Sequence, residues 1–164
     1  MQRFEAFTIR AYRPTDAEQI AALFRDTVRI VNLGDYTEAQ VKAWAPEEVG
    51  ADRWAAILGA ARRATFVAVA GELVVGFADV ELDGHLDHLF VHHRHQRQGV
   101  ASALHDAVEA AARRSGAARL YTEASITARP FFLRQGYVEV RPQTVTVRDV
   151  AFINFVMEKS LSGA

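Results

Sequence analysis

The stretch from residue 86 to residue 115 most strongly constrains how this chain can fold. An apolar segment, Leu86 to Val91, runs into a basic loop and then into a helical pattern that begins at Gly99. No aspartate or glutamate occurs between His88 and His105, although acidic residues normally gather in the first turn of a helix, where unpaired amides favour negative charge. The segment therefore predicts a strand, a loop and a helix start that binds an external anion, and phosphate suits such a position.

Two blocks of sequence resemble one known family. The loop Gln96-Arg97-Gln98-Gly99-Val100-Ala101 resembles the Gln/Arg-x-x-Gly-x-Gly/Ala signature of the GNAT superfamily, the general-control-related N-acetyltransferases. Residues 125–137 resemble that family's second block, Asn-x-x-Ala-x-x-Leu/Phe-Tyr-x-x-x-Gly-Phe. The loop alone would also fit a basic loop before an ordinary amphipathic helix. Because both blocks occur in order with strands between them, the chain is identified as a member of this family.

The resemblance implies an α/β (α+β) fold with a mixed, mainly antiparallel central sheet flanked by helices, whose fourth and fifth strands splay apart. It also implies acetyl-CoA as cosubstrate, with its pyrophosphate on the backbone amides of the glycine loop. The pantetheine arm would lie between residues 89–91 and 121–123, paired with main-chain groups of Leu89 and Val91 like an added strand. The implied cofactor-binding residues are Leu89, Phe90, Val91, Gln96, Arg97, Gln98, Gly99, Val100, Ala101, Ser102, Ser125, Ala128, Phe131 and Phe132.

Hydrophobic periodicity and turn residues predict the remaining elements. Capping boxes at residues 15–18 and 37–40 open two helices, the second ended by Pro46. A third helical stretch includes Trp54, and a short helix runs from about Ala128 to Gly136. Strands are expected over residues 7–12, 65–70, 73–82, 86–91, 119–124, 137–140 and 147–157.

Composition limits the class of protein. With 164 residues, 50% of them hydrophobic, the chain can bury one core, and we expect a single domain over residues 1–164. A net charge of −1 argues against binding nucleic acid or a membrane surface. Cysteine is absent, which excludes a disulfide framework and a catalytic thiol. No apolar run has the length of a signal-peptide core or a membrane span, so we expect a cytoplasmic monomer or homodimer.

Acetyl transfer to an amine needs a base for the amine and can use an acid for the leaving sulfur. Strand alternation would place His85, Asp87, Leu89 and Val91 on one face and His88 on the other. Asp87, upstream of the implied cofactor stretch, is the first candidate for the base, and His85 is the second. The alternative for Asp87 is a partly exposed carboxylate paired with an arginine.

The residue expected to protonate the leaving sulfur departs from the family pattern. Many relatives donate a proton to the sulfur from a tyrosine, whose position is taken here by Phe132. Either the thiolate leaves without help, or Ser125 or Tyr121 supplies the proton. Because free thiols have a pKa near 8.5, the loss of the acid need not abolish turnover. Tyr137 matches the family's aromatic after glycine and is interpreted as packing.

Five histidines cluster between residues 85 and 95, which invites a metal interpretation. Alternation would place His85 and His88 on opposite faces, and the spacing matches no paired metal motif. We therefore expect no metal. Histidines of the loop near phosphates, or solvated ones, are the preferred explanation.

The aromatic side chains Tyr36, Trp44 and Trp54 lie in a helical region that, in relatives, covers the acceptor side of the cleft. They predict an apolar or aromatic acceptor pocket, with core packing of the tryptophans as the alternative. Asp35, Glu38 and Asp79 could attract a cationic amine or could simply lie at the surface.

The function predicted from these features is N-acetylation. An acetyl group passes from acetyl-CoA to a primary amine of a small or amino-acid-like molecule, by direct attack in a ternary complex. Two alternatives stay open: a non-catalytic acyl-CoA sensor on the same fold, suggested by Phe132, and acetylation of a protein lysine or N-terminus.

Overall fold

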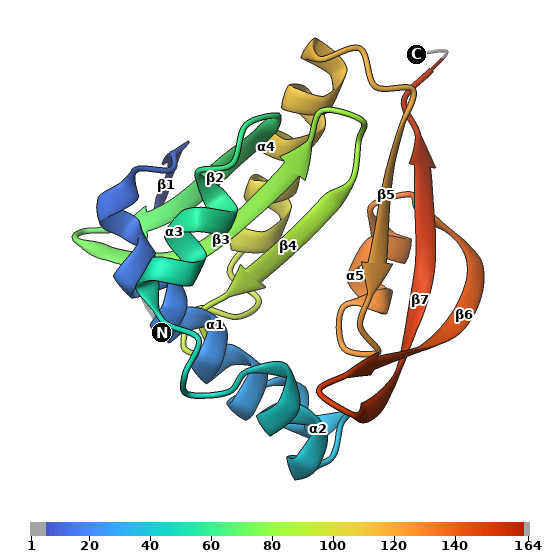
Figure 1. Ribbon diagram of the computed structural model, residues 1–164. Helices are drawn as coiled ribbons and strands as arrows, with labels where there is room; N and C mark the ends of the chain where they lie inside the picture. Colours follow the sequence, from blue (N-terminus) through green and yellow to red (C-terminus); the bar gives the residue numbers. More distant parts are fainter. Residues whose placement is uncertain (1–5, 163–164) are drawn as a thin grey trace.

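The computed structural model describes residues 6–162 of the chain. Its helices and strands follow one another along the chain in the order that the sequence predicts (Figure 1). The strands are β1 (Thr8–Ala11), β2 (Arg63–Ala70), β3 (Leu73–Glu81), β4 (Leu86–Val91), β5 (Arg119–Ala124), β6 (Val138–Val147) and β7 (Val150–Ser160). The helices are α1 (Ala17–Ile30), α2 (Glu38–Trp44), α3 (Ala51–Leu58), α4 (Val100–Arg114) and α5 (Arg129–Arg134), with short 3-10 helices η1 (Pro14–Asp16) and η2 (Asn32–Gly34).

The strands form two antiparallel sheets that meet at one point. The first sheet has the order β1-β2-β3-β4 and the second has the order β5-β7-β6. A single parallel bridge joins His85, just before β4, to Tyr121 on β5. Beyond it the two strands diverge toward their carboxyl ends, as Figure 1 shows. The predicted mixed, mainly antiparallel sheet with a splay between its fourth and fifth strands is therefore confirmed.

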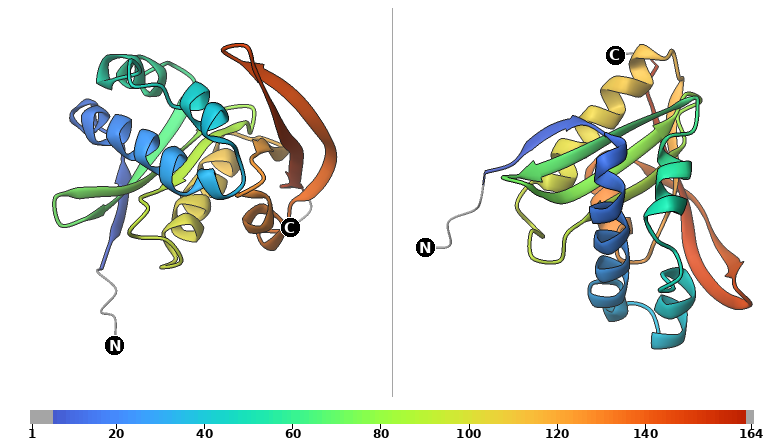
Figure 2. Two further views of the ribbon diagram at one scale, coloured as in Figure 1. Left: turned by 90° about the horizontal axis from the view of Figure 1, so that it is seen from below. Right: turned by 60° about the vertical axis from the view of Figure 1, so that its left-hand side comes forward.

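Helices cover both faces of the first sheet, and each buries an apolar stripe. Val100, Leu104 and Val108 of α4 pack in one hydrophobic cluster. Ile20 and Phe24 of α1 pack in a second cluster, which also contains residues of α2 and α3. Figure 2 shows α1 and α3 on the opposite side of the sheet from α4. The helical spacing of these apolar residues places them on one face of each helix, toward the sheet.

One of the two predicted capping boxes is present. Thr37 accepts a hydrogen bond from the Gln40 amide at 3.1 Å, and α2 ends before Pro46 as expected. Thr15, in contrast, caps nothing, because the chain enters α1 through the 3-10 turn that Pro14 begins. The buried carboxylate of Asp16 accepts from the Arg13 amide at 2.8 Å and from the Arg10 guanidinium at 2.9 Å. Its hydrogen bond with Arg10 lowers the pKa of Asp16.

The last hairpin is longer than predicted. The sequence placed a break between residue 140 and Val147, but β6 continues through this segment and pairs with β7. The turn lies instead at Arg148 and Asp149, both with positive φ (47° and 65°). Pro142 lies within this segment, and it is tolerated because β6 is an edge strand, where a missing amide proton needs no partner.

No helix within residues 6–162 combines the length and the apolar character needed to cross a bilayer.

Candidate active site

The first turn of α4 has backbone amides without hydrogen-bond partners in the described part of the chain. Gly99 is the N-cap of α4 and has a φ of 83°, a conformation that favours glycine. A Cβ built at this position would meet no atom within 4 Å. Ala103 donates to the Gly99 carbonyl at 3.0 Å, which starts the helix. The amides of residues 100–102 make no hydrogen bond to the described part of the chain. Since the first turn also lacks acidic residues, its geometry suits an external anion.

The side chain of Gln96 ties this loop to the end of β4. Its Nε2 donates to the carbonyl oxygen of Val91 at 2.7 Å. The neighbouring guanidinium groups of Arg94 and Arg97 are exposed. The loop is thus fixed by Gln96 while two cations remain available beside the open amides.

The edge of β4 that faces β5 offers free peptide groups. The His92 amide donates to the Val75 carbonyl on β3, so strand alternation turns the peptide groups of Leu89 and Val91 to the opposite edge. The carbonyl of Val91 already accepts from Gln96 and, at 3.2 Å, from the Thr27 hydroxyl. Leu89 therefore keeps both groups for a ligand, whereas Val91 can offer only its amide. Of the main-chain pairing predicted for both residues, the two peptide groups of Leu89 and the amide of Val91 therefore remain available.

A cleft of about 390 Å³ lies between the two sheets. Its walls come from β4, β5, α5, the helical region and the β6–β7 hairpin. Its lining includes nine of the predicted site residues, whereas the glycine loop of residues 96–102 and His85, Val91, Tyr121 and Phe131 lie outside it. The predicted residues in the lining are Tyr36, Trp44, Trp54, Asp87, Leu89, Phe90, Ser125, Ala128 and Phe132.

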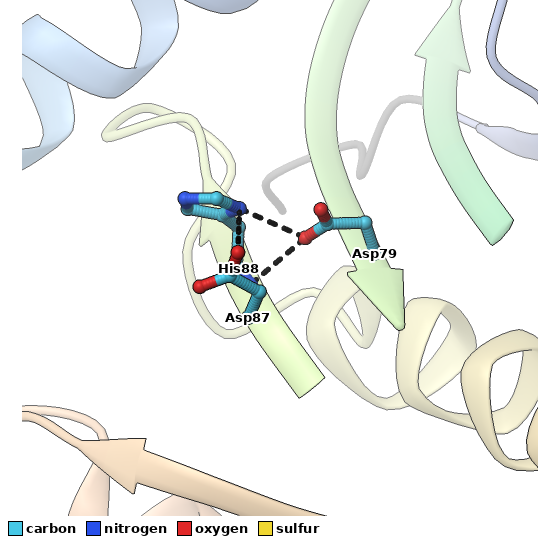
Figure 3. A group of neighbouring side chains, drawn as sticks. All are labelled: Asp79, Asp87 and His88. Atoms are coloured by element: carbon cyan, nitrogen blue, oxygen red, sulfur yellow. Dashed lines mark hydrogen bonds and ion pairs between the residues drawn. The ribbon is translucent and has the colours of Figure 1, made fainter. Parts of the chain in front are cut away.

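A β-bulge in β4 corrects the predicted alternation. His88 pairs with Asp79 and Leu86 pairs with Val80, so Asp87 has no partner on β3. The extra residue reverses the face of the sheet to which the preceding side chains point. Leu86 therefore packs in the same hydrophobic cluster as Val91. The bulge also brings Asp87 Oδ2 to 3.7 Å from Nδ1 of His88. Two side chains predicted on opposite faces therefore lie together beside Asp79 (Figure 3).

Asp87 forms an ion pair with an arginine, which is the alternative that the sequence left open. The Arg63 guanidinium donates to Asp87 at 2.9 Å and also to Asp79. Burial raises the pKa of Asp87, but the charges of His88 and Arg63 outweigh burial, and the net pKa lies below the ordinary value. A carboxylate stabilised in this way is a weak base, so the structure disfavours the predicted role of Asp87.

His85 is held between two carboxylates. Its Nε2 lies 2.7 Å from Glu123 and its Nδ1 lies 2.9 Å from Glu81. The hydrogen bond with Glu123 outweighs burial and, with the bond to Glu81, raises the pKa of His85 to about 9. The imidazole is therefore protonated at neutral pH and cannot accept a proton. This protonation disfavours the predicted role of His85 as a base.

Tyr121 is also unsuited to its predicted role. Its hydroxyl donates to Asp83 at 2.5 Å, and this hydrogen bond, reinforced by burial, raises the pKa of Tyr121 to about 12. The ring stacks on His85 with 4.9 Å between ring centroids, outside the cleft lining. A phenol whose proton is already given to a carboxylate is a poor acid for a leaving thiolate.

Ser125 and Phe132 both line the cleft. The Ser125 oxygen accepts from the Ala128 amide at 3.0 Å, which leaves its own proton free to donate. Phe132 is 3% exposed and packs against Tyr137 with 4.9 Å between ring centroids. Tyr137 is buried in the core, which confirms its interpretation as packing. Of the proposed acids, only Ser125 lines the cleft.

The three aromatic candidates line the cleft, and two of them are also buried in the core. Trp54 and Tyr36 are buried in the core cluster and also line the cleft, which Trp44 lines as well. The Tyr36 hydroxyl donates to the Ile153 carbonyl at 2.8 Å and accepts from the Ile126 amide at 2.9 Å. Tyr36 thus fastens the helical region to the second sheet, and the pocket wall is apolar.

The sequence left open a surface position for Asp79, but this residue is fully buried, with 0% exposure. The signal in the sequence was an aspartate inside the apolar strand 73–82, because a buried carboxylate requires partners. Those partners, Arg63 and His88, come from β2 and β4 and were not identified from the sequence. Glu38 pairs with Lys42 at 2.8 Å and Asp35 accepts from Thr127 at 2.7 Å.

The group of Asp79, Asp87 and His88 has metal-ligand atoms within 4.8 Å of one another. Arg63 Nη1 donates to both carboxylates, however, and so supplies the positive charge that a metal ion would bring. The arrangement is that of a hydrogen-bonded ion-pair network.

Comparison with known proteins agrees with this geometry. Residues 32–159 match the family model described as the acetyltransferase (GNAT) domain. The chain belongs to the GNAT family, and it is an enzyme of the N-acetyltransferase class.

Two relatives cover nearly the whole chain. The uncharacterized N-acetyltransferase YafP of Escherichia coli strain K12 is 36% identical over 149 residues, which are 91% of this chain and 93% of that protein. A GCN5-related N-acetyltransferase from Rhodopseudomonas palustris is 33% identical, with a TM-score of 0.89 over 98% of this chain and 99% of the other. The PaiA N-acetyltransferase of Thermoplasma acidophilum, solved in complex with coenzyme A, shares the fold at 15% identity, with a TM-score of 0.75 over 94% of this chain and 99% of that one.

Proposed function

We propose that this protein transfers an acetyl group from acetyl-CoA to the primary amine of a small or amino-acid-like acceptor, by direct attack in a ternary complex. The observation that supports this proposal is the free edge of β4, which lines the cleft and whose end is tied by Gln96 to the loop before the open amides of α4. That PaiA was solved with coenzyme A supports the choice of donor.

The residues present fit such a donor. The amides of residues 100–102, with Arg94 and Arg97 beside them, would hold the pyrophosphate. The peptide groups of Leu89 would pair with amides of the pantetheine arm. When bound, acetyl-CoA supplies a thioester, whose carbonyl carbon is open to a neutral amine. Among the predicted acids, the Ser125 hydroxyl is the one placed to donate a proton in this cleft.

The acceptor is proposed from the shape and charge of the cleft. A volume of about 390 Å³ suits a small molecule. Trp44, Phe90 and Phe152 give it an apolar aromatic wall, and the carboxylates of Asp87 and Glu123 line it as well. An amine with an apolar body matches both features. A lysine side chain or a free N-terminus would present the same amine, and separate substrates distinguish these cases.

A second candidate function rests on Phe132, which has no proton to give where relatives carry a tyrosine. This feature favours a non-catalytic acyl-CoA sensor. A sensor would bind the thioester without turning it over.

Thiol release tests both functions. Purified protein is incubated with acetyl-CoA and a panel of amines, namely amino acids, aryl-alkyl amines, polyamines, and peptides with a free lysine or N-terminus. We expect thiol release well above the buffer rate with at least one small amine. Tight binding by calorimetry without release from any amine would establish the sensor instead. Release with peptides alone would move the acceptor to a macromolecule.

A further inference from the structure

The buried carboxylate of Asp79 organises the side chain that follows the bulge in β4. Its Oδ1 accepts from the His88 backbone amide at 2.8 Å and lies 2.9 Å from the ring nitrogen Nδ1 of the same residue. Its Oδ2 accepts from Arg63. Because Asp79 is fully buried, water cannot substitute for these partners. The histidine ring is therefore held in one orientation.

This contact sets which ring nitrogen of His88 carries the proton. A carboxylate paired with Arg63 accepts hydrogen bonds, so Nδ1 must donate. The neutral ring then has its lone pair on Nε2. The described residues give Nε2 no hydrogen bond, and Figure 3 shows this nitrogen pointing away from Asp79. An oriented imidazole with a free acceptor nitrogen is the arrangement of a general base.

The imidazole ring of His88 also lies where a ligand in the cleft can reach it. His88 lines the cleft and immediately precedes Leu89, whose peptide groups face the opening between β4 and β5. Its ring packs edge-on against Trp54, with 4.9 Å between centroids. The side chain retains 18% of its exposure, so a ligand in the cleft can reach it.

We propose that His88 is the general base of the acetyl transfer and that Asp79 is its positioning residue. This inference rests on the proposed function. The amine nitrogen forms a bond to the acetyl carbonyl carbon and gives its proton to Nε2 of His88. The carbon–sulfur bond breaks, and its electron pair leaves with the thiolate, which solvent or Ser125 protonates. The base then returns its proton to solvent.

Charged groups from several elements surround His88. Asp79 on β3, Asp87 on β4 and Arg63 on β2 form the network at Nδ1. Glu123 on β5, Arg53 on α3 and Arg148 in the hairpin turn line the same cleft. None of the other charged groups of the cleft is a histidine, the side chain that ordinarily titrates near neutral pH.

Two substitutions separate the two ring nitrogens. In His88→Asn the side-chain amide can replace Nδ1–H as donor to Asp79, while the atom at Nε2 is removed. In His88→Gln the amide reaches the position of Nε2 but cannot act as a base. We expect both to lower kcat/KM by about 100- to 10,000-fold, with coenzyme A affinity by calorimetry unchanged. Asp87→Asn, which keeps His88, should lower kcat/KM less than either His88 substitution.

The pH–rate profile is measured with two amines of different pKa, so that an acid limb common to both belongs to the enzyme. This limb should disappear in both His88 variants. If His88→Asn retains the wild-type kcat/KM and the same limb, His88 is not the base.

A measurement without turnover decides the arrangement if no amine is acetylated. Nitrogen-15 chemical shifts of the histidine rings, with His88→Asn used for assignment, report which nitrogen is protonated. We expect Nδ1–H with a bare Nε2 in the neutral form of His88. A proton on Nε2 would overturn the proposal, whereas absence of acetylation from any amine would overturn the proposed function alone.

Discussion

The hydroxyl of Thr122 on β5 donates a hydrogen bond to the carbonyl oxygen of Leu86 on β4, at 2.9 Å. Both residues are buried, and the bond lies next to the single bridge that joins the two sheets. At the narrow end of the splay, the hydroxyl of Thr122 thus donates to β4 where a main-chain amide would donate in a regular sheet. From this point the strands separate and leave the edge of β4 free for a ligand.

Replacement of Thr122 by valine should loosen this closure. Valine keeps the shape of threonine but leaves the buried Leu86 carbonyl without a partner, which costs about 1–3 kcal/mol. Urea denaturation should show this loss in the free energy of unfolding. Thr122→Ser retains the hydroxyl and serves as the control. Equal stability of the valine and serine variants would show that the hydrogen bond does not hold the strands together.

Gly99→Glu should abolish coenzyme A binding. The new carboxylate would lie at the start of α4 and compete with phosphate for the open amides, and the positive φ adds strain. We expect at least a 100-fold loss of affinity by calorimetry, about 3 kcal/mol. Gly116→Glu is the matched control, because Gly116 has a φ of 81° and open space at the other end of the same helix. Equal affinities of the two variants would refute the assignment of the loop.

His85 should make stability depend on pH. Its pKa is raised to about 9 in the folded protein, mainly by the hydrogen bond with Glu123, from about 6.5 in an unfolded chain. The contribution is therefore complete below about pH 6.5 and is lost as the pH rises through 9. The free energy of unfolding should fall over this range by on the order of 1–3 kcal/mol. His85→Gln should flatten the curve, and a wild-type curve that is already flat would contradict the double ion pair.

Phe132→Tyr introduces the hydroxyl that the family resemblance implies at this position. If proton donation to the sulfur limits turnover, kcat should rise several-fold with coenzyme A affinity unchanged. Stopped-flow thiol release measures the effect, and thermal unfolding checks that the added hydroxyl is tolerated at a buried position. A folded variant with unchanged kcat would show that the thiolate leaves without an acid from this residue.

Local sequence was enough for β5 and for the start of α4, but not for the last hairpin. β5 begins and ends at the predicted residues, and α4 begins after Gly99 as predicted. These elements depend on neighbouring residues: apolar periodicity, a glycine at positive φ, and a helix start without acidic side chains. The family motifs added the mainly antiparallel sheet and the splay between its fourth and fifth strands, both of which the structure confirms.

The chemistry of the cleft depended on contacts between distant residues. Asp87 and His85 were predicted as bases because of their positions along a strand, but Arg63 and Glu123, far away in sequence, change their protonation. The bulge at Asp87 also brought Asp87 next to His88, which simple alternation could not show. The edge position of β6, which makes Pro142 acceptable, is likewise a property of the assembled sheet.

The sequence by itself determined the secondary structure around the glycine loop and the family of this protein, because those signals come from residues close together in the chain. Only the tertiary structure decided which side chains carry charge in the cleft and which histidine is free to accept a proton. A group's protonation is set by the burial and partners that packing gives it, and those partners come from other strands.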